Sequence, residues 1–322
     1  MSNKTLTVRV NRVRPEAIDI VSFELVDPAG QKLPDFTPGS HIDVHVVPGI
    51  VRQYSLCNAP GDTYHYLIAV KREAKSRGGS SGMHERIKEG DQLTISVPRN
   101  NFVLDEGASH YTLIAGGIGI TPILSMARHL EKAGASFRLL YFTRSIKHTA
   151  FHELLGGRGV YSNRVHFHYA LEPDATKAYL RHTLADRPEG GQMYICGPKP
   201  FMDMVEDIAA THWPPQAIHL EYFNADPEAL SGPTGEFEVT LARSGRTYLI
   251  PEDKSVVEVL AENGIEVEVS CEQGICGTCL TGVLEGDPDH RDMYLTDEEK
   301  AAGDKMTVCV SRAQGRKLVL DL

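Results

Sequence analysis

The 322-residue sequence has no long apolar run, because no segment approaches the roughly 18 consecutive apolar residues that a bilayer-spanning helix needs. It also lacks internal repeats and low-complexity tracts. The first 19 residues, MSNKTLTVRVNRVRPEAID, contain no apolar segment of the secretory type, so we expect no export signal. These absences predict a soluble cytoplasmic protein that does not associate with a membrane.

An excess of positive charge is missing as well. The chain contains 33 Lys and Arg residues against 43 Asp and Glu residues, and its formal net charge of −10 argues against a nucleic-acid partner. Most of this acidity lies in residues 236–322, where 9 basic and 18 acidic side chains give a balance of −9. Two interpretations remain open, namely solubility and an acidic face that steers docking to a basic protein.

Cysteine is scarce, but four of the six cysteines form a pattern. Cys271, Cys276 and Cys279 lie in SCEQGICGTC (270–279), and Cys309 follows after 29 intervening residues. Thiols stay reduced in the cytosol, so this cluster predicts a metal site rather than disulfides. The C-x4-C-x2-C spacing with a distant fourth cysteine is typical of a plant-type [2Fe–2S] cluster. Zinc is the alternative, although zinc sites more often use two C-x2-C pairs.

The periodicity of the sequence divides the chain into parts. Residues 1–106 contain short turn-separated β segments, such as HIDVHVV (41–47), whose alternation predicts half-buried antiparallel strands with solvated polar faces and a small β-barrel. Residues 107–226 alternate strands with helices, which predicts a doubly wound parallel sheet. Residues 227–235 have the composition of a linker. Residues 236–322 contain a hairpin, a helix and a closing strand around the cysteines.

A glycine-rich junction, AGGIGITP (115–122), joins the first strand of that parallel sheet to its helix. Gly116, Gly117 and Gly119 would allow a tight turn and a close approach of the backbone to a ligand. The helix start, with Thr121 as its expected N-cap, would present N–H groups to a diphosphate. The pattern is not G-x-G-x-x-G, and a tight turn without a ligand is the alternative.

Three further short motifs carry polar or glycine residues suited to cofactor binding. They are RQYSLCN (52–58), SRGGS (76–80) and ICGP (195–198). The first supplies a cation, a phenol and a hydroxyl, and the second offers glycines and hydroxyls that suit a phosphate. Each motif alone is compatible with an ordinary polar turn, but their succession along the chain indicates a cofactor-binding protein.

In this order, the motifs resemble those of the ferredoxin–NADP reductase superfamily. With the cysteine module at the C-terminal end, the whole chain resembles the phthalate dioxygenase reductase family, which includes the vanillate demethylase reductases. The resemblance implies a multidomain fold with an FMN-binding antiparallel β-barrel (1–106), a doubly wound NAD-binding domain (107–226), a linker (227–235) and a β-grasp [2Fe–2S] ferredoxin domain (236–322).

The family resemblance also implies a function. A nicotinamide delivers two electrons together, whereas a [2Fe–2S] cluster accepts one, and a flavin converts between the two. We therefore expect electrons to pass from NADH through FMN to the cluster and then to a Rieske-type oxygenase that attacks an aromatic acid or a similar small molecule. We expect a monomer. The alternatives are a stand-alone flavin-dependent NADH oxidase or diaphorase and a zinc-stabilised interaction protein.

Residue roles follow from the same resemblance. Ser55 is expected near the reactive edge of the flavin, Cys196 where nicotinamide meets flavin, and Phe223 stacked on the isoalloxazine, with Tyr222 as the competing candidate. The preference for FMN over FAD and for NADH over NADPH also rests on the family. The other expected cofactor contacts are Arg52, Tyr54, Gly78, Gly79, Ser80, Gly116, Gly117, Gly119, Thr121, Arg144 and Gly197.

Overall fold

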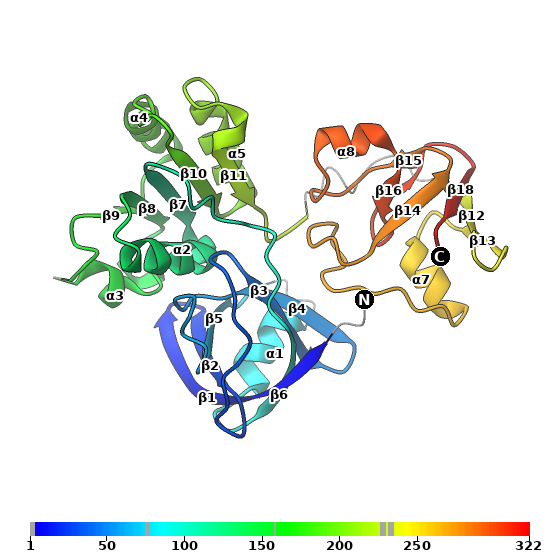
Figure 1. Ribbon diagram of the computed structural model, residues 1–322, viewed down its shortest axis with the longest axis horizontal. Helices are drawn as coiled ribbons and strands as arrows, with labels where there is room; N and C mark the ends of the chain where they lie inside the picture. The colour runs from blue at the N-terminus through cyan, green and yellow to red at the C-terminus, as the bar shows by residue number, and fades with distance from the viewer. Residues whose placement is uncertain (1–3, 75–77, 158, 226–229, 231–234) are drawn as a thin grey trace. The chain divides into compact units, whose positions relative to one another are not determined.

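The computed structural model describes residues 4–74, 78–157, 159–225, 230 and 235–322, and it forms two compact units, Met1–Glu221 and Tyr222–Leu322 (Figure 1). Most of the stretch 227–235, interpreted as a linker, lies outside the described residues, as do Ser76 and Arg77 of the SRGGS motif. None of the helices in the described part of the chain has the length and hydropathy of a membrane-crossing segment.

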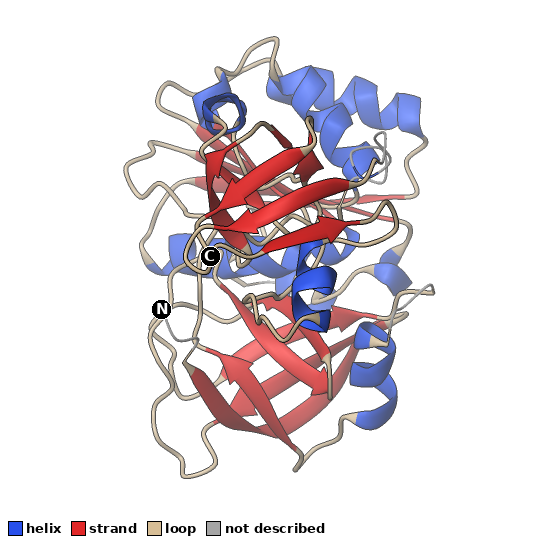
Figure 2. Ribbon diagram, turned by 90° about the vertical axis from the view of Figure 1, so that its right-hand side faces the viewer, coloured by secondary structure: helices blue, strands red, loops and turns tan. Residues whose placement is uncertain are grey.

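The first unit begins with a six-stranded antiparallel sheet of order β4-β3-β6-β1-β2-β5. A bridge between Leu56, just after β4, and Ile68 in β5 connects the two outer strands, which closes the sheet into a barrel (Figure 2). Alternate residues such as Val8 and Val10 fill its core. The elements are β1 (Thr5–Ala17), β2 (Ile20–Val26), β3 (His41–Val47), β4 (Ile50–Ser55), β5 (Tyr66–Lys71), α1 (Gly79–Arg86) and β6 (Gln92–Ser96).

Strand β3 departs from the simple alternation that its sequence suggests. Its apolar residues enter the barrel core and His45 is exposed, but His41 and Asp43 are each only 4% exposed. Arg99 explains this burial, because its guanidinium lies 2.6 Å from the Asp43 carboxylate and its backbone pairs with that of His41. Burial, with the Arg99 charge, lowers the pKa of His41 to about 4 and keeps the imidazole neutral. The expectation that His41 and Asp43 face solvent is therefore wrong.

A five-stranded parallel sheet of order β11-β10-β7-β8-β9 follows in the same unit. Helix α2 covers one face, and α4 and α5 pack together on the other (Figure 1). The strands are β7 (Tyr111–Gly116), β8 (Phe137–Thr143), β9 (Val165–Tyr169), β10 (Gln192–Cys196) and β11 (Ile218–Glu221). The helices are α2 (Ile120–Lys132), α3 (His152–Gly156), α4 (Pro173–Leu184) and α5 (Lys199–Ala209).

The order of these strands creates a switch point between β7 and β10. From β7 the chain runs outward through β8 and β9, and it then returns to the other side of β7 to add β10 and β11. Crevices at the carboxyl ends of strands beside such a point are the usual ligand sites of open α/β sheets. The barrel is tied to this sheet by the Ser125 hydroxyl, which donates to the backbone oxygen of Asn58 at 3.0 Å.

The second unit contains a mixed five-stranded sheet of order β13-β12-β18-β14-β16 with α7 packed against it. Strands β12 and β18 are parallel neighbours, and β14 runs antiparallel to β18, as in a β-grasp fold. These elements are β12 (Phe237–Leu241), β13 (Thr247–Ile250), α7 (Val256–Glu262), β14 (Leu280–Glu285), β16 (Lys305–Thr307) and β18 (Lys317–Leu320). The short pieces are β15 (Pro288–Asp289), α8 (Asp297–Ala302) and β17 (Arg312–Ala313).

Candidate redox site

The start of α1 and the middle of β4 meet at one place. Gly78 precedes α1 with a φ of 92°, a conformation that favours glycine, and no described side chain caps the helix. A Cβ on Gly79 would lie 2.6 Å from Cγ and 2.8 Å from Nε of Arg52, so the Arg52 side chain lies directly over the helix start. A cation beside a helix start where no described side chain acts as the cap fits the phosphate of a flavin nucleotide. Ser80 accepts a hydrogen bond from the Glu73 amide at 3.1 Å.

The end of β4 supplies a second feature suited to a ligand. The Tyr54 hydroxyl is buried, and it has no hydrogen-bond partner among the described residues. Burial raises the pKa of this phenol, which therefore stays a hydrogen-bond donor. Ser55, the next residue, is 6% exposed. Because buried polar groups are normally satisfied, the orphaned hydroxyl fits a position against a polar flavin edge.

The glycine-rich junction brings the ends of β7 and β10 into contact. A Cβ on Gly119 would overlap the carbonyl oxygen of Cys196 and lie 2.7 Å from the amide nitrogen of Gly197. A Cβ on Gly116 would lie 2.9 Å from the Phe201 ring. Gly117 instead serves the turn, with a φ of 54° and open space around its Cα. Gly116 and Gly119 are therefore required by packing within the fold itself.

Thr121 differs from its expected role as an N-cap. Helix α2 begins at Ile120, and Gly119 occupies the cap position. Thr121 is 2% exposed, and its hydroxyl donates to the backbone oxygen of Ile118 at 3.0 Å. Its side chain, in the first turn of α2, thus stabilises the glycine-rich segment that precedes the helix.

A buried thiol and a half-exposed glutamate with one buried carboxylate oxygen lie at the carboxyl ends of β10 and β11. Cys196 is fully buried, and burial raises the pKa of its thiol well above the ordinary value. Its register partner on β11 is Glu221, whose Oε2 is buried without a partner among the described residues. Burial raises the pKa of Glu221 to about 8, so the carboxyl group is neutral at pH 7. The sequence analysis did not select Glu221, although an acid at the end of a predicted strand could have pointed to it.

The remaining candidates are Arg144, Tyr222 and Phe223. Arg144 is exposed just after β8, where Ser145 hydrogen-bonds to His148 Nδ1 at 2.8 Å. Tyr222 and Phe223 are half-buried and belong to the second unit. The stacking of Phe223 on the flavin therefore stays a prediction.

The four cysteines of the second unit form two pairs. The thiols of Cys271 and Cys276 hydrogen-bond to each other, and so do those of Cys279 and Cys309. All four are at most 9% exposed. The bond from Cys271 lowers the pKa of Cys276 to about 6, and the bond from Cys309 lowers that of Cys279. No three His, Cys, Asp or Glu side chains in the described ranges form a group suited to one metal ion, and two thiol pairs match a cluster with two irons.

The backbone of the cysteine loop is also suited to a cluster. The amides of Gln273 and Thr278 point at the sulfurs of Cys271 and Cys276, at 3.3 and 3.4 Å. Hydrogen bonds to the sulfurs are one way in which proteins adjust the reduction potential of such clusters. These donors, together with the four thiols, fit a [2Fe–2S] group.

The comparisons with known proteins agree with this geometry. Residues 113–207 match the family model of the oxidoreductase NAD-binding domain, and residues 239–314 match that of the 2Fe-2S iron-sulfur cluster binding domain. The two domains on one chain, beside a flavin-reductase fold, define an electron-transfer oxidoreductase.

Three relatives of this chain are named as oxidoreductases or as reductases of oxygenase systems. The chain is 46% identical to a vanillate O-demethylase oxidoreductase of Pseudomonas sp. (strain HR199 / DSM 7063), over 98% of this chain and 100% of that relative. It is 46% identical to a phthalate 4,5-dioxygenase oxygenase reductase subunit of Pseudomonas putida, over 94% and 92% of the two chains. The solved structure of a phthalate dioxygenase reductase is similar with a TM-score of 0.77 and 42% identity, covering 99% and 98%.

The chain belongs to the phthalate dioxygenase reductase family. The family resemblance, the multidomain fold class and the electron-transfer function expected from the sequence are therefore confirmed. The expected cofactor set of FMN, a [2Fe–2S] cluster and NADH is supported as well.

We predict that Gly119→Ala separates the ends of β7 and β10, because its Cβ would overlap the Cys196 carbonyl. Forced overpacking of this kind costs about 3 kcal/mol, which should lower the unfolding midpoint and the rate of flavin reduction by NADH. Gly159→Ala is the matched control, since a Cβ there meets nothing within 4 Å. Equal unfolding midpoints for the two variants would contradict the prediction.

A second prediction concerns Glu221. The folded protein keeps the Glu221 proton up to about pH 8, whereas the unfolded chain loses it above about pH 4.5. The contribution of Glu221 to the free energy of unfolding is therefore largest at low pH and decreases as the pH rises between these two values. Glu221→Gln is neutral throughout and should flatten this pH dependence in denaturant titrations. The exposed-site control Glu189→Gln should retain the wild-type profile. A wild-type-like slope in the Glu221 variant would show that the buried carboxyl does not contribute.

Proposed function

We propose that this chain is the reductase component of a multicomponent Rieske-type oxygenase. Relatives over almost their full length are named as reductases of vanillate demethylase and phthalate dioxygenase systems, which supports an oxygenase as the acceptor. The observation that carries the proposal is the pairing of the four cysteines on a chain that also has an NAD-binding domain. In this proposal the protein acts in the cytoplasm as a monomer.

The proposal divides the chain into an FMN domain (1–106), an NAD domain (107–226), a linker (227–235) and a [2Fe–2S] domain (236–322). When bound, FMN would accept two electrons from NADH and release them one at a time. Arg52, Gly78, Gly79 and Ser80 would hold its phosphate, and Tyr54 and Ser55 would contact its ring system. The orphaned Tyr54 hydroxyl supports this arrangement.

The NAD-binding residues would act by position and charge. Gly116, Gly117, Gly119, Thr121 and Gly197 would form the turn against the diphosphate. Arg144 is exposed after the second strand of the sheet, where it would contact the ribose end of the dinucleotide.

The residues beside the reacting rings would be Ser55, Cys196 and Phe223, with Glu221 as an addition from the structure. The neutral Cys196 thiol and the neutral Glu221 carboxyl would line the nicotinamide position without a buried negative charge. Because hydride transfer needs no covalent nucleophile, their work would be to orient the ring and exclude water.

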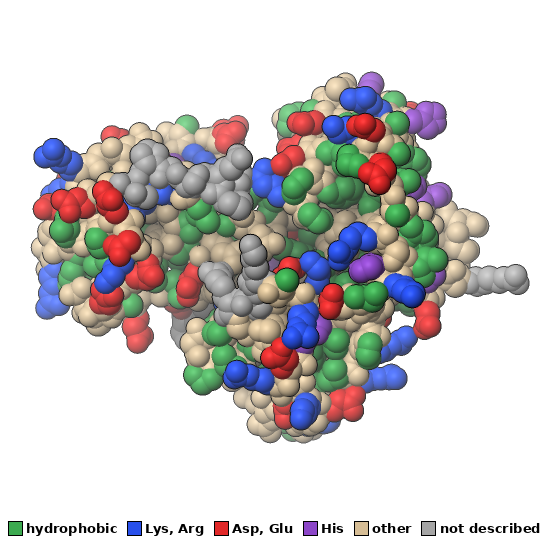
Figure 3. Space-filling model, turned by 180° about the vertical axis from the view of Figure 1, so that it is seen from behind, with side chains coloured by type: hydrophobic (Ala, Val, Ile, Leu, Met, Phe, Trp, Pro, Cys, Tyr) green, Lys and Arg blue, Asp and Glu red, His purple; other side chains and the backbone are tan. Residues whose placement is uncertain are grey.

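The four cysteines, Cys271, Cys276, Cys279 and Cys309, would hold the cluster, with one pair on each iron. The acceptor would meet the unit that contains them. Figure 3 shows several carboxylate side chains on the surface of this unit in the view from behind. Glu268 and Glu272 are exposed next to the cysteine loop, which supports docking of a basic surface on the acceptor.

An anaerobic titration with NADH tests the function. The expected result is bleaching of flavin and iron–sulfur absorbance with about three electrons per chain, two for the flavin and one for the cluster. Cys309→Ser should lower the count to about two while the flavin is still reduced. A wild-type protein that contains zinc instead of iron, or that reduces oxygen rapidly without any acceptor protein, would contradict the proposal.

The acidic docking surface gives a further prediction. Replacing both Glu268 and Glu272 with Gln should weaken reduction of the acceptor protein and its dependence on salt, with flavin reduction by NADH unchanged. The matched control replaces Glu238 and Glu285, exposed acids in the same unit; Glu285 lies at the end of β14 far from Cys279. The same loss in both double variants would argue for net charge rather than a local docking site.

A further inference from the structure

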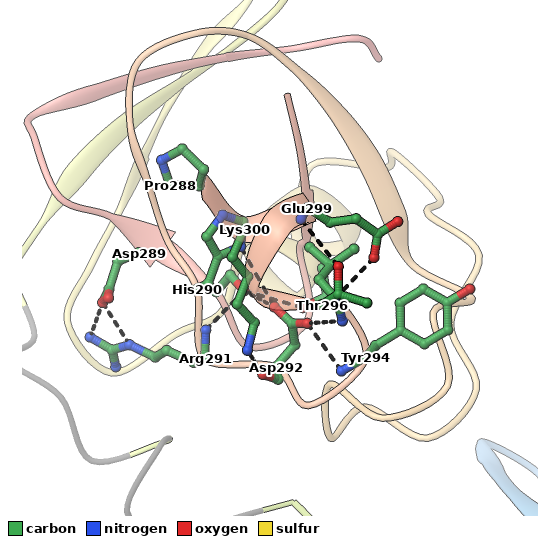
Figure 4. Close-up of polar contacts among 12 residues, drawn as sticks. Pro288, Asp289, His290, Arg291, Asp292, Tyr294, Thr296, Glu299 and Lys300 are labelled. Atoms are coloured by element: carbon green, nitrogen blue, oxygen red, sulfur yellow. Dashed lines mark hydrogen bonds and ion pairs between the residues drawn. The ribbon is translucent and has the colours of Figure 1, made fainter. Parts of the chain in front are cut away.

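Residues 288–296 of the second unit run from β15 to the residue before α8 and contain no cysteine (Figure 4). This segment carries a buried carboxylate, that of Asp292. The side chain of Asp292 is 0% exposed. Its Oδ2 accepts hydrogen bonds from the amides of Tyr294 at 3.1 Å and Leu295 at 2.8 Å. A side-chain oxygen that accepts from amides two and three residues ahead fixes a tight turn.

On one side this turn lies against the loop that contains three of the cysteines. A Cβ on Gly274 would lie 3.0 Å from Cα and 3.1 Å from Cβ of Asp292, and the Met293 amide donates to the Gly274 oxygen at 2.9 Å. The Tyr294 ring covers Gly277 so closely that a Cβ there would lie 2.6 Å from its Cε1. The 288–296 segment therefore contacts both glycines between Cys271 and Cys279.

On its other side the same carboxylate reaches the turn that contains the fourth cysteine. The Ser311 hydroxyl lies 3.4 Å from Asp292 Oδ1 and donates to it. Ser311 is bonded to Thr307 through its amide, at 3.0 Å, and its hydroxyl lies 3.1 Å from the Thr307 hydroxyl. These bonds close the 307–311 turn around Cys309, so Asp292 connects the two chain segments that supply the thiol pairs.

The Asp292 carboxylate is held by hydrogen bonds from backbone amides and a hydroxyl. His290 Nδ1 lies 3.7 Å from Oδ1, beyond hydrogen-bond distance, and Lys300 donates to the backbone oxygen of Asp292 rather than to its carboxylate. Arg291 is paired with Asp289 through Nη2 at 2.8 Å. Burying a carboxylate is costly unless hydrogen bonds compensate, and here the compensating donors are mainly the two backbone amides and Ser311.

We propose that Asp292 is a positioning residue for the cluster, one that keeps the 271–279 loop and the 307–311 turn at the separation at which both cysteine pairs meet the two irons. This inference rests on the proposed cluster at the four cysteines. It concerns ligand geometry, so its effects are expected in the spectrum and lifetime of the cluster and not in the reaction of NADH with the flavin.

The experiment compares full-length, flavin- and iron-loaded wild type with Asp292→Ala, Asp292→Asn and Asp289→Ala. The readouts are iron per chain, the EPR spectrum of the reduced cluster, the bleaching rate in an iron chelator, and flavin reduction by NADH. Asp292→Ala leaves the buried Leu295 amide and the partly buried Tyr294 amide without their acceptor, so we expect changed EPR g-values and about tenfold faster bleaching, with normal flavin reduction. Asp292→Asn should keep the two amide bonds through its amide oxygen but lose the acceptor for Ser311, because an NH2 group replaces Oδ1, so we expect bleaching slower than in Asp292→Ala and an EPR change like that of Ser311→Ala. Asp289, a half-exposed acid of the same segment, is the matched control.

The outcomes separate the two levels of the proposal. Wild-type EPR and bleaching in Asp292→Ala, or equal effects in Asp289→Ala, would overturn the positioning role while leaving the cluster in place. Absence of iron from the wild type would overturn the proposed cluster and this inference with it. If Asp292→Ala fails to fold, Ser311→Ala replaces it, because that variant removes the hydroxyl contacts to Asp292, Thr307 and the Arg291 amide but leaves the Asp292 carboxylate bonded to the Tyr294 and Leu295 amides. It should change the EPR spectrum in the same direction, and an unchanged spectrum would overturn the role.

Discussion

Two neighbouring parallel strands end within contact distance of each other, and this approach depends on the missing side chain of Gly119. The carbonyl of Cys196 occupies the space that a Cβ would fill, so the turn after β7 and the turn after β10 form one continuous surface. That surface lies at the switch point of the sheet, where open α/β folds bind ligands. The register of β10 and β11 places Glu221 beside Cys196 at this end of the sheet.

Some buried polar atoms of the first unit have no hydrogen-bond partner among the described residues, which suits contact with a ligand. The Tyr54 hydroxyl and the Glu221 carboxyl are both withdrawn from water without a described partner, which a fold tolerates only at a cost in free energy. They belong to the barrel wall and to the edge of the parallel sheet, the two elements that a flavin and a nicotinamide would need. The desolvation that raises both pKa values keeps these groups neutral, which suits the approach of electron-rich rings.

Much of this organisation could be predicted from the sequence. Turn-separated β segments, the strand–helix rhythm and the cysteine spacing predicted the barrel, the parallel sheet and the cluster module, because each depends on local periodicity. Long-range contacts could not be found that way. The alternation of β3 predicted solvated polar residues, but Arg99, 56 positions beyond Asp43, buries that carboxylate. Glu221 and Asp292 are ordinary acids in the sequence, and only tertiary packing shows that they are buried. Thr121 looked like a cap, yet Gly119 takes that position because the turn before α2 is tight.

The division of the cysteines into two pairs bears on how the protein is made. Cys271 and Cys276 pair within a single loop, but the partner of Cys279 is Cys309, which lies beyond β14 and β16 and 30 positions further along the chain. A nascent chain that has left the ribosome only as far as Cys279 can offer one complete pair of thiols. With the four proposed ligands, a cluster would be held on both sides only after the strand that leads to Cys309 has been synthesised and paired with β14. Maturation of the metal centre is thus tied to completion of this small domain, and a chain truncated before that point would be left with exposed, oxidisable thiols.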